Sequence, residues 1–304
     1  MKILIFGCAG YIGSEVTLHL LGAGHEIIGV DALVYRQTCV VQRLTHPRFN
    51  FYQGNLGDYA LLSTLPKADI VINLAGYVGD QALKLWPNEA RNTNVTQTKA
   101  NIDFYKNSRA AYIFASSCSV YGHSTVPATE TSPTRPLSEY ASQKIEVEEY
   151  LAQTIPNSKI FRLATVFGPS LRTRVDLLVN QLVFNAVTGT TTVLYRLNDW
   201  RPYLYIKDIG PLFGQLIGTR AQLVNLGCDQ NNVTKQQLVE MIGAIVPKDS
   251  YQLQRVDDGP DYRDYRVSFE LLSAITSAPR TLLEDGISEL YNALSRKDCY
   301  VDRN

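Results

Sequence analysis

The sequence predicts an α/β protein with a doubly wound parallel sheet and a smaller C-terminal α/β lobe. Short apolar runs typical of buried strands alternate with longer helical patterns up to about residue 170. A glycine-rich turn between Gly7 and Gly13 joins the first apolar run to the first helical pattern. Such alternation favours a parallel sheet covered by helices on both faces. Beyond residue 170 the alternation weakens, so we expect the smaller lobe to begin there.

Six apolar runs supply the strands expected in the first part, at residues 1–6, 26–31, 49–54, 69–76, 112–115 and 159–163. The helical patterns among them cover residues 14–21, a short stretch ending near Pro66, and residues 87–108 and 138–155. In the second part we expect helices at 175–188 and 235–245 and strands at 191–194 and 223–227. We therefore divide the chain at 1–170 and 171–304, with some later segments returning to the first domain.

Composition narrows the classes of function. Lys and Arg together number 29, as do Asp and Glu, so no basic excess points to nucleic acid or an anionic membrane surface. The five cysteines are scattered without a CxxC pair, which argues against a disulfide framework or a structural zinc site. No signal-peptide pattern precedes the first strand, and no apolar run is long enough to span a membrane. We expect a cytoplasmic protein.

The glycine turn predicts a dinucleotide site. Gly7 would let the strand turn sharply, Gly10 would let the backbone approach a diphosphate, and Gly13 would let the helix pack closely. The helix N-terminus would then offer free N–H groups to phosphate. The alternative is a glycine-rich turn without a ligand.

Asp31 ends the second expected strand, eighteen residues beyond Gly13. An acid at about this offset binds the adenosine ribose hydroxyls and disfavours a 2′-phosphate. The sequence therefore predicts a Rossmann-type domain that binds NAD rather than NADP. A solvated aspartate at a strand end is the alternative for Asp31.

Tyr140 and Lys144 lie four residues apart in a helical pattern and so share a face. An ammonium group beside a phenol favours the phenolate, so we expect Lys144 to lower the Tyr140 pKa and make Tyr140 a base. Two surface side chains are the alternative. The strand before this helix ends in Ser116 and Ser117, and a serine hydroxyl there could form a hydrogen bond with the same substrate oxygen as Tyr140.

Taken together, these motifs resemble the extended short-chain dehydrogenase/reductase superfamily, in its NAD-dependent nucleotide-sugar epimerase/dehydratase family. The resemblance is to proteins like UDP-glucose 4-epimerase and covers nearly the whole chain. Further matching residues, in order, are Leu74-Ala75-Gly76, Asn94-Val95, Ser117 to Gly122, Arg162, Phe167-Gly168-Pro169, Arg201-Pro202 and Asp208.

The resemblance implies a role for each matched residue. Tyr140 would take the proton from a sugar hydroxyl, Lys144 would hold the nicotinamide ribose, and Ser117 would bond the reacting oxygen. Ser116 would be structural. The cofactor-binding residues implied are Gly7, Gly10, Tyr11, Ile12, Asp31, Asn55, Leu56, Leu74, Ala75, Gly76, Asn94 and Lys144. The substrate-binding residues implied are Ser117, Cys118, Ser119, Asn180, Arg201 and Arg263.

Some of these assignments have alternatives. Asn180 would meet the sugar's phosphate, and Arg201 would clamp the diphosphate unless it forms a surface salt bridge. Arg263 is a second phosphate candidate. Asn55 stands where the family usually has Asp, and Asp80 could reach the sugar or cap the next helix.

The turn after Ser117 bears most directly on the reaction. Family members that eliminate water have a sequence similar to Thr-Asp-Glu at this turn, and its two carboxyl groups act as acid and base. Here Cys118 and Ser119 stand in those places, so 4,6-dehydration is disfavoured. Members that epimerise at C3 or C5 carry a cysteine one place later, so Cys118 does not match that role, and a packed thiol is its other interpretation.

We therefore predict an NAD-dependent nucleotide-sugar epimerase acting at C4, by transient hydride transfer to tightly bound NAD and a 4-keto-sugar. The alternatives are an NAD(P)-dependent nucleotide-sugar dehydrogenase or 4-keto-reductase, a 4,6-dehydratase, and a non-catalytic nucleotide-binding subunit. Two departures from the family are Tyr205 for His and Thr165 for Asn. The expected partners are a nucleotide-diphosphate sugar and a second copy of the chain, paired through the helices near 90–108 and 138–155.

Overall fold

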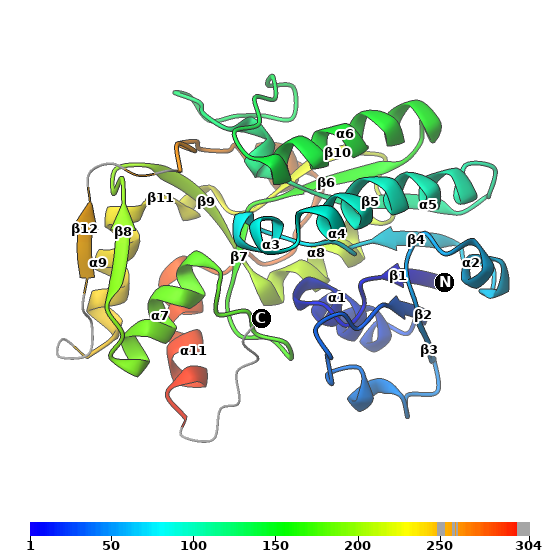
Figure 1. Ribbon diagram of the computed structural model, residues 1–304, viewed down its shortest axis with the longest axis horizontal. Helices are drawn as coiled ribbons and strands as arrows, with labels where there is room; N and C mark the ends of the chain where they lie inside the picture. The colour runs from blue at the N-terminus through cyan, green and yellow to red at the C-terminus, as the bar shows by residue number, and fades with distance from the viewer. Residues whose placement is uncertain (248–252, 257–258, 260, 297–304) are drawn as a thin grey trace.

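A computed structural model describes residues 1–247, 253–256, 259 and 261–296 of the chain. Its main feature is a seven-stranded sheet in the order β10-β6-β5-β4-β1-β2-β3, in which every neighbouring pair is parallel (Figure 1). These strands are β1 (Lys2–Phe6), β2 (Glu26–Asp31), β3 (Phe49–Gln53), β4 (Ile70–Asn73), β5 (Ala111–Ser117), β6 (Lys159–Leu163) and β10 (Leu223–Leu226). The strand order reverses at β1, where a doubly wound sheet opens a crevice for a ligand. The predicted fold class is confirmed.

Side chains of β1 alternate between two cores. Ile3 and Ile5 belong to the core shared with α1 (Tyr11–Gly22) and α8 (Ile209–Leu216). Leu4 and Phe6 belong to the core shared with α2, α5 and α6 on the other face. The bounds of those helices are α2 (Tyr59–Thr64), α5 (Thr98–Tyr105) and α6 (Glu139–Thr154). Because both faces are covered, the strands carry apolar residues almost continuously.

The expected helix at 87–108 is interrupted. It consists of α4 (Pro87–Arg91), a π-helical turn (Asn92–Gln97) and α5. A short helix, α3 (Asp80–Leu85), precedes it. The next helix, α6, follows the prediction closely, because the Ser138 side chain accepts a hydrogen bond from the Ala141 amide and so caps its start.

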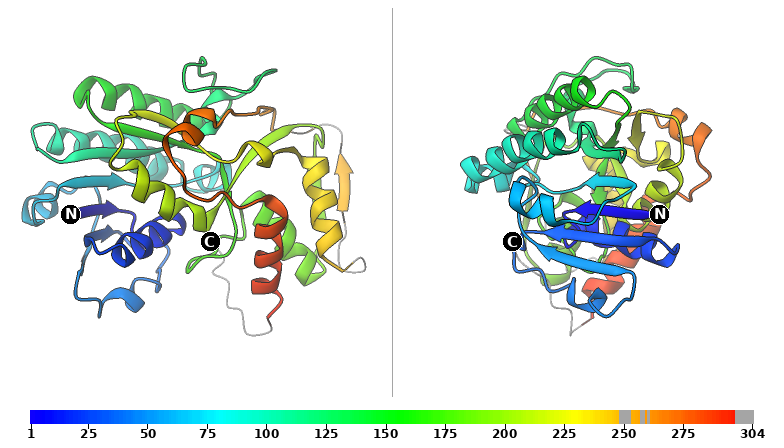
Figure 2. Two further views of the ribbon diagram at one scale, coloured as in Figure 1. Left: turned by 180° about the vertical axis from the view of Figure 1, so that it is seen from behind. Right: turned by 90° about the vertical axis from the view of Figure 1, so that its right-hand side faces the viewer.

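The second part of the chain lies beside the carboxyl ends of the sheet strands (Figures 1 and 2). It holds a parallel pair, β12-β8, and two strands of a three-stranded sheet in the order β11-β9-β7, whose strand β7 comes from the end of the first part. The strands are β7 (Thr165–Phe167), β8 (Thr192–Tyr195), β9 (Trp200–Tyr205), β11 (Asn232–Thr234) and β12 (Leu253–Val256). The helices are α7 (Leu178–Thr188), α9 (Lys235–Ile245), α10 (Glu270–Ile275) and α11 (Leu283–Leu294).

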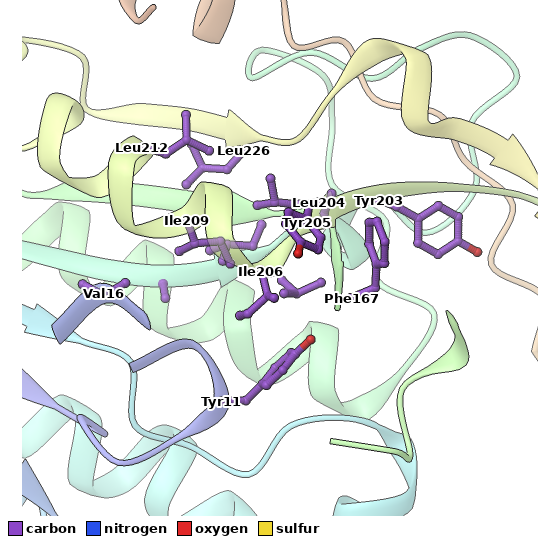
Figure 3. Packing of buried hydrophobic residues seen from close by; sticks show 14 of the residues in the cluster. Tyr11, Val16, Phe167, Tyr203, Leu204, Tyr205, Ile206, Ile209, Leu212 and Leu226 are labelled. Carbon is purple, nitrogen blue, oxygen red and sulfur yellow. The ribbon is translucent and has the colours of Figure 1, made fainter. Parts of the chain in front are cut away.

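Two segments of the second part return to the main sheet, and the later one is α10, which contacts β10. After β9 the chain forms α8, which packs beside α1, and then β10, which pairs with β6. Figure 3 shows the result: Tyr11 and Val16 of α1 lie near Ile206 and Ile209 within one apolar core. The two parts therefore share a core, and the strand ends and the second part face the same space.

Other expectations concern cysteines and membranes. Cys8, Cys39, Cys118 and Cys228 are buried free thiols, whereas Cys299 lies outside the described residues. Among the helices that the structure describes, none combines the length and the apolar composition that a bilayer crossing requires.

Candidate active site

The glycine turn is as tight as the sequence predicts. Gly7 has a φ of 79°, and a Cβ there would lie 2.8 Å from the Ala75 nitrogen. A Cβ on Gly13 would lie 1.9 Å from the Gly7 oxygen, which no side chain tolerates. Gly10 precedes the first turn of α1, and that turn contains no acidic residue. The N-terminal N–H groups of α1 thus meet no side-chain carboxylate in their own turn, which suits an anionic ligand.

Asp31 joins the glycine turn to the loop after β2. One carboxylate oxygen accepts a hydrogen bond from the Ala9 amide at 3.0 Å, and the other accepts from the Leu33 amide at 2.8 Å. Burial raises the pKa of Asp31, while these two amide hydrogen bonds oppose that rise. The carboxylate is thereby held rigidly at the end of β2, where a ribose would need it.

Asp31 borders a cavity of about 100 Å³ at the carboxyl ends of β1, β2 and β4. Eight of the predicted cofactor residues line this cavity: Gly7, Gly10, Asp31, Asn55, Leu56, Leu74, Ala75 and Gly76. Three others, Tyr11, Ile12 and Lys144, line an adjoining and larger cavity.

Asn94 is the exception, because it does not appear among the described residues that line either cavity. Its side chain accepts from the Tyr77 amide at 2.8 Å and donates to the Tyr77 oxygen at 2.9 Å. It also donates to the Gln143 side chain. Asn94 therefore holds the loop after β4 in place, and the structure does not bring it to the cofactor cleft.

The larger cavity has a volume of about 520 Å³ and brings Ser117, Tyr140 and Lys144 together. Ser117 ends β5, and its oxygen accepts hydrogen bonds from the Ser119 amide at 3.2 Å and the Ser119 hydroxyl at 2.9 Å. Lys144 donates to the Ala115 oxygen at 2.7 Å. Its nitrogen lies 5.7 Å from the centre of the Tyr140 ring.

The electrostatics of this trio differ from the expectation. Burial lowers the pKa of Lys144 from 10.5 to about 8, against the opposing charge of Glu148 one turn along α6. Burial raises the pKa of Tyr140 well above its ordinary value, and the positive charge of Arg174 opposes that rise in part. The expectation that Lys144 lowers the Tyr140 pKa is thus wrong for this structure, because the cost of burying a phenolate outweighs the nearby cations.

A buried network of hydrogen bonds holds the end of β5 in place. The Ser116 hydroxyl donates to Glu148, whose carboxylate also accepts from Arg162 at 2.6 Å. Both members of this ion pair have only 7% exposed side chains. Arg162 further donates to the Tyr121 hydroxyl at 3.0 Å. Ser116 is therefore used inside this network, as the structural interpretation of that residue predicts.

Two predicted substrate residues lie away from the cavity. Cys118 is fully buried, and its thiol donates to the Arg162 oxygen at 3.2 Å. Burial raises the pKa of this thiol. Asn180 is also fully buried, accepting from the Gly168 amide and donating to the Arg174 oxygen and the Tyr11 hydroxyl. Neither residue lines the larger cavity, because packing and hydrogen bonds to other parts of the chain use the two side chains.

Arg201 and Arg263 meet at one carboxylate, and all three side chains line the larger cavity. Asp261 accepts from Arg201 at 3.0 Å and from Arg263 at 2.7 Å. Burial alone would raise the pKa of Asp261, but the two guanidinium groups lower it overall. Arg201 is 5% exposed, so its ion pair is not a surface salt bridge.

Asp80 lies at the start of α3, where the sequence allowed it to cap that helix or to reach the sugar. It is the first residue of α3, and the residue in the capping position before it is Gly79. Its carboxylate lies 2.7 Å from Arg263 and borders the larger cavity. Asp80 therefore pairs with an arginine of the cavity wall instead of capping the helix.

Sequence reasoning missed the segment between Pro169 and α7. Arg172, Arg174 and Asp176 all line the larger cavity, and Arg174 binds Asp176 through two hydrogen bonds. Three charged residues at alternate positions, shortly after the strand β7, were the available signal.

Two residues depart from the family pattern. Thr165 lines the larger cavity, whereas Tyr205 does not line it and donates a hydrogen bond to Glu289.

The glycine turn and the acid at the end of β2, beside the Ser-Tyr-Lys trio, are features of a dinucleotide-binding α/β protein. The family model of the NAD dependent epimerase/dehydratase family matches residues 3–226, and this chain belongs to that family. NAD is the family's cofactor, and the residues fit it: the backbone leaves no room for a Cβ at Gly7 or Gly13, and Asp31 occupies the end of β2.

Similar proteins include both epimerases and dehydratases. UDP-glucose 4-epimerase of Lactobacillus helveticus is 31% identical over 50% of this chain and 46% of its own length. The chain thus spans about half the length of the first curated relatives it matches.

Among solved structures, UDP-glucuronic acid 4-epimerase of Bacillus cereus, in complex with UDP-glucuronic acid and NAD, has a TM-score of 0.86 at 21% identity. The match covers 97% of this chain and 99% of that one. dTDP-glucose 4,6-dehydratase of Bacillus anthracis, in complex with NAD, has a TM-score of 0.84 at 24% identity, covering 98% and 97%. At these identities the likeness shows the fold alone.

Proposed function

We propose that this protein is an NAD-dependent nucleotide-sugar epimerase acting at C4. One observation carries the choice between epimerisation and dehydration. Among the residues that the structure describes, three carboxylates line the larger cavity, those of Asp80, Asp176 and Asp261, and each forms an ion pair with an arginine. A carboxylate held by a guanidinium group is a poor proton donor or acceptor near neutral pH.

This observation extends the argument from the turn after β5. Elimination of water needs one group to remove a proton and another to protonate the departing hydroxide. The pKa of Asp176, which burial alone would raise, is lowered overall by its hydrogen bonds from Arg174. Ser119 offers only a hydroxyl, and the Cys118 thiol lies in the core. The described cavity therefore supports a reaction that needs Ser117, Tyr140 and Lys144 alone.

Each of these residues would have a defined task. NAD, when bound, would accept a hydride from the sugar carbon and later return it. Tyr140 would take the hydroxyl proton at its phenolic oxygen and give it back to the carbonyl oxygen. To act as a base Tyr140 must lose its proton, and Arg174 and Lys144 supply positive charge in the same cavity. Ser117 would bond the same sugar oxygen and orient it.

The other end of the substrate would be held by charge. Arg201 and Arg263 line the cavity with donors suited to a diphosphate, and we infer that they share these donors between Asp261 and the nucleotide. We also propose that residues 171–304 form mainly the substrate-binding lobe. A homodimer and a cytoplasmic location stay predictions.

Proton NMR in D₂O tests the proposal directly. The protein as purified, without added cofactor, is incubated with UDP-glucose, UDP-galactose, UDP-glucuronic acid or UDP-N-acetylglucosamine. For at least one of them we expect the C4 epimer, with every carbon-bound hydrogen retained, because the hydride returns to the carbon it left. Tyr140→Phe serves as the inactive control.

Other products would identify the alternatives. A 4-keto-6-deoxy sugar carrying solvent deuterium would mean that the protein is a dehydratase. NADH formed in proportion to substrate, without an epimer, would mean that it is a dehydrogenase. If a 4-keto-sugar consumed NADH or NADPH and gave only one alcohol, the protein would be a reductase.

A further inference from the structure

Arg172 lies at the boundary between the two cavities. It belongs to the segment that follows β7, in the second part of the chain, yet it lines both cavities. Tyr35, in the loop after β2, also lines both. The guanidinium carbon of Arg172 lies 4.7 Å from the centre of the Tyr35 ring, which is cation–π contact. The other residues shared by the two cavities are Gly7, Gly10, Leu74 and Gly76.

If NAD occupies both cavities, its diphosphate would lie at this boundary. The smaller cavity is lined by Asp31 and would hold the adenosine half, whereas the larger is lined by the Ser-Tyr-Lys trio. The diphosphate is the part of a dinucleotide that joins its two halves, and two of the shared residues belong to the glycine turn. Arg172 would therefore add a full positive charge to the backbone N–H groups that the turn supplies.

The electrostatic surroundings of Arg172 favour an anion. Its side chain is largely buried, with 7% of the residue exposed. Burial and the positive charge of Arg174 both lower the pKa of Arg172, while Tyr35, Asp31 and Cys39 oppose this. Two neighbouring guanidinium groups in a cleft repel each other, and a diphosphate between the cavities would relieve that repulsion.

The segment around Arg172 is held by hydrogen bonds. The Ser170 amide donates to the Thr173 hydroxyl at 3.0 Å, and that hydroxyl donates to the Ser170 oxygen at 2.9 Å. The Arg172 amide donates to the Ser170 hydroxyl oxygen. Arg174 donates to the Val78 oxygen at 3.0 Å and so ties the segment to the loop after β4.

Tyr35 is held in a similar way. Its ring packs against Tyr77 and Trp86, with centroid distances of 6.2 and 6.0 Å. Both members of the cation–π pair are thus fixed by neighbours from other loops, and three loops meet beside the cofactor cleft. Such prior order lowers the entropy cost of binding.

We propose that Arg172, held against Tyr35, binds the diphosphate of the dinucleotide and keeps the cofactor bound between turnovers. The proposal rests on the proposed function, because an epimerase must hold the reduced cofactor until the hydride returns. Arg172 belongs to the second part of the chain, whereas the glycine turn belongs to the first. Retention of the cofactor therefore depends on both parts and not on the glycine turn alone.

Cofactor binding, measured apart from sugar turnover, tests this inference. Variants Arg172→Gln, Arg172→Lys, Tyr35→Phe and Tyr35→Leu are purified beside wild type, and bound NAD and NADH are released with acid and quantified per chain. The stripped proteins are then titrated with NAD in a calorimeter. The matched control is Arg36→Gln, which removes an exposed arginine that is next to Tyr35 in sequence and outside both cavity linings.

For Arg172→Gln we expect loss of most co-purified cofactor and NAD affinity about 10- to 100-fold weaker, as for a lost charge-assisted hydrogen bond. Arg172→Lys keeps the charge without the planar stack and should be intermediate. Tyr35→Phe should match wild type, because the ring remains, whereas Tyr35→Leu should bind NAD about 3- to 10-fold more weakly. Circular dichroism and thermal unfolding without NAD establish that each variant is folded.

Wild-type occupancy and affinity in Arg172→Gln would overturn the inference and leave the epimerase proposal intact. If Arg172→Gln does not fold, wild-type NAD affinity in Tyr35→Leu would overturn it equally. If no UDP-sugar is epimerised by wild type while Arg172→Gln loses NAD, the inference stands and the proposed function fails.

Discussion

Lys144 donates a hydrogen bond from its ammonium group to the backbone oxygen of Ala115, 2.7 Å away. This contact ties α6, which carries Tyr140, to β5, which ends in Ser117. The nitrogen also lies 4.5 Å from the centre of the Phe114 ring. Together with the hydrogen bond from Ser116 to Glu148, this side chain holds the two elements of the site against each other, at the cost of burying a charge.

The buried ammonium predicts a pH-dependent stability. The pKa of Lys144 falls from 10.5 to about 8 on folding, mainly because of burial. Below pH 8 the folded and unfolded chains both carry the proton, so the full cost of burying the charge is paid. Between pH 8 and 10.5 the unfolded chain binds more protons, so the contribution of Lys144 to stability rises with pH, by about 3 kcal/mol in total.

Urea unfolding at a series of pH values measures this effect. The difference in unfolding free energy between wild type and Lys144→Met should increase from pH 8 to pH 10.5. Lys84, which is exposed on α3, gives the matched control Lys84→Met. A constant difference for Lys144→Met would show that its ammonium group keeps an ordinary pKa.

Tyr140→Phe should abolish turnover while sparing the cofactor. The substitution removes only the phenolic oxygen that would carry the proton, so we expect kcat to fall by about 100- to 10,000-fold. The ring stays packed beside Leu83 and Ala90, so thermal stability and bound NAD should match wild type. Tyr59→Phe, at a residue that is 72% exposed, should have wild-type kcat. Epimerase activity that survives in Tyr140→Phe would contradict the proposed mechanism.

Two glycines of α1 make a matched pair. Alanine at Gly13 would place its Cβ 1.9 Å from the Gly7 oxygen, and the backbone cannot give way cheaply. We expect Gly13→Ala to destabilise the fold by about 3 kcal/mol and to lose bound NAD. Gly22 has no atom within 4 Å of the same position, so Gly22→Ala should stabilise the helix by up to ~1 kcal/mol. Equal unfolding midpoints for the two variants would contradict the close packing of α1.

Local sequence signals predicted the strands of the main sheet, the glycine turn and the Ser-Tyr-Lys trio. Strands such as β1 and β6 are short apolar runs between turn residues, and the glycine spacing predicts the tight turn that the structure contains. Ser117, Tyr140 and Lys144 lie on elements that the alternation of strands and helices places correctly. Their meeting in one cavity follows from the parallel sheet, because successive strand ends lie on the same edge.

The contacts that the sequence did not reveal are long-range. The Asn180 side chain forms hydrogen bonds with the Gly168 amide and the Tyr11 hydroxyl and does not line the cavity. No residue pattern near Asn180 in the sequence predicts these contacts. The segment that contains Arg172 has no regular period, and its importance comes from contact with a loop more than a hundred residues earlier. The direction of the Tyr140 pKa shift depends on burial, which residue spacing does not encode.

Cys118 and Ser117 are neighbours in sequence with opposite surroundings. The Cys118 thiol is fully buried and bonds the Arg162 oxygen, whereas Ser117 lines the larger cavity. Cys118→Ala should therefore keep kcat and KM within about threefold of wild type and lose about 1–2 kcal/mol of stability, as for a small buried group. Ser117→Ala should keep its stability within about 1 kcal/mol and lose kcat about 10- to 100-fold, because a hydrogen bond to the reacting oxygen disappears.

Steady-state kinetics and urea unfolding on both variants separate the two roles. Thiol reagents provide a second readout, because a buried thiol with a raised pKa reacts slowly while the protein is folded. Folded wild type should therefore resist alkylation at Cys118, and urea should expose it. A hundredfold loss of kcat in Cys118→Ala, with an unchanged unfolding midpoint, would mean that the thiol acts in the reaction. Cys118, the first residue after β5, would then have to enter the cavity during turnover, and its thiol could take part in an elimination.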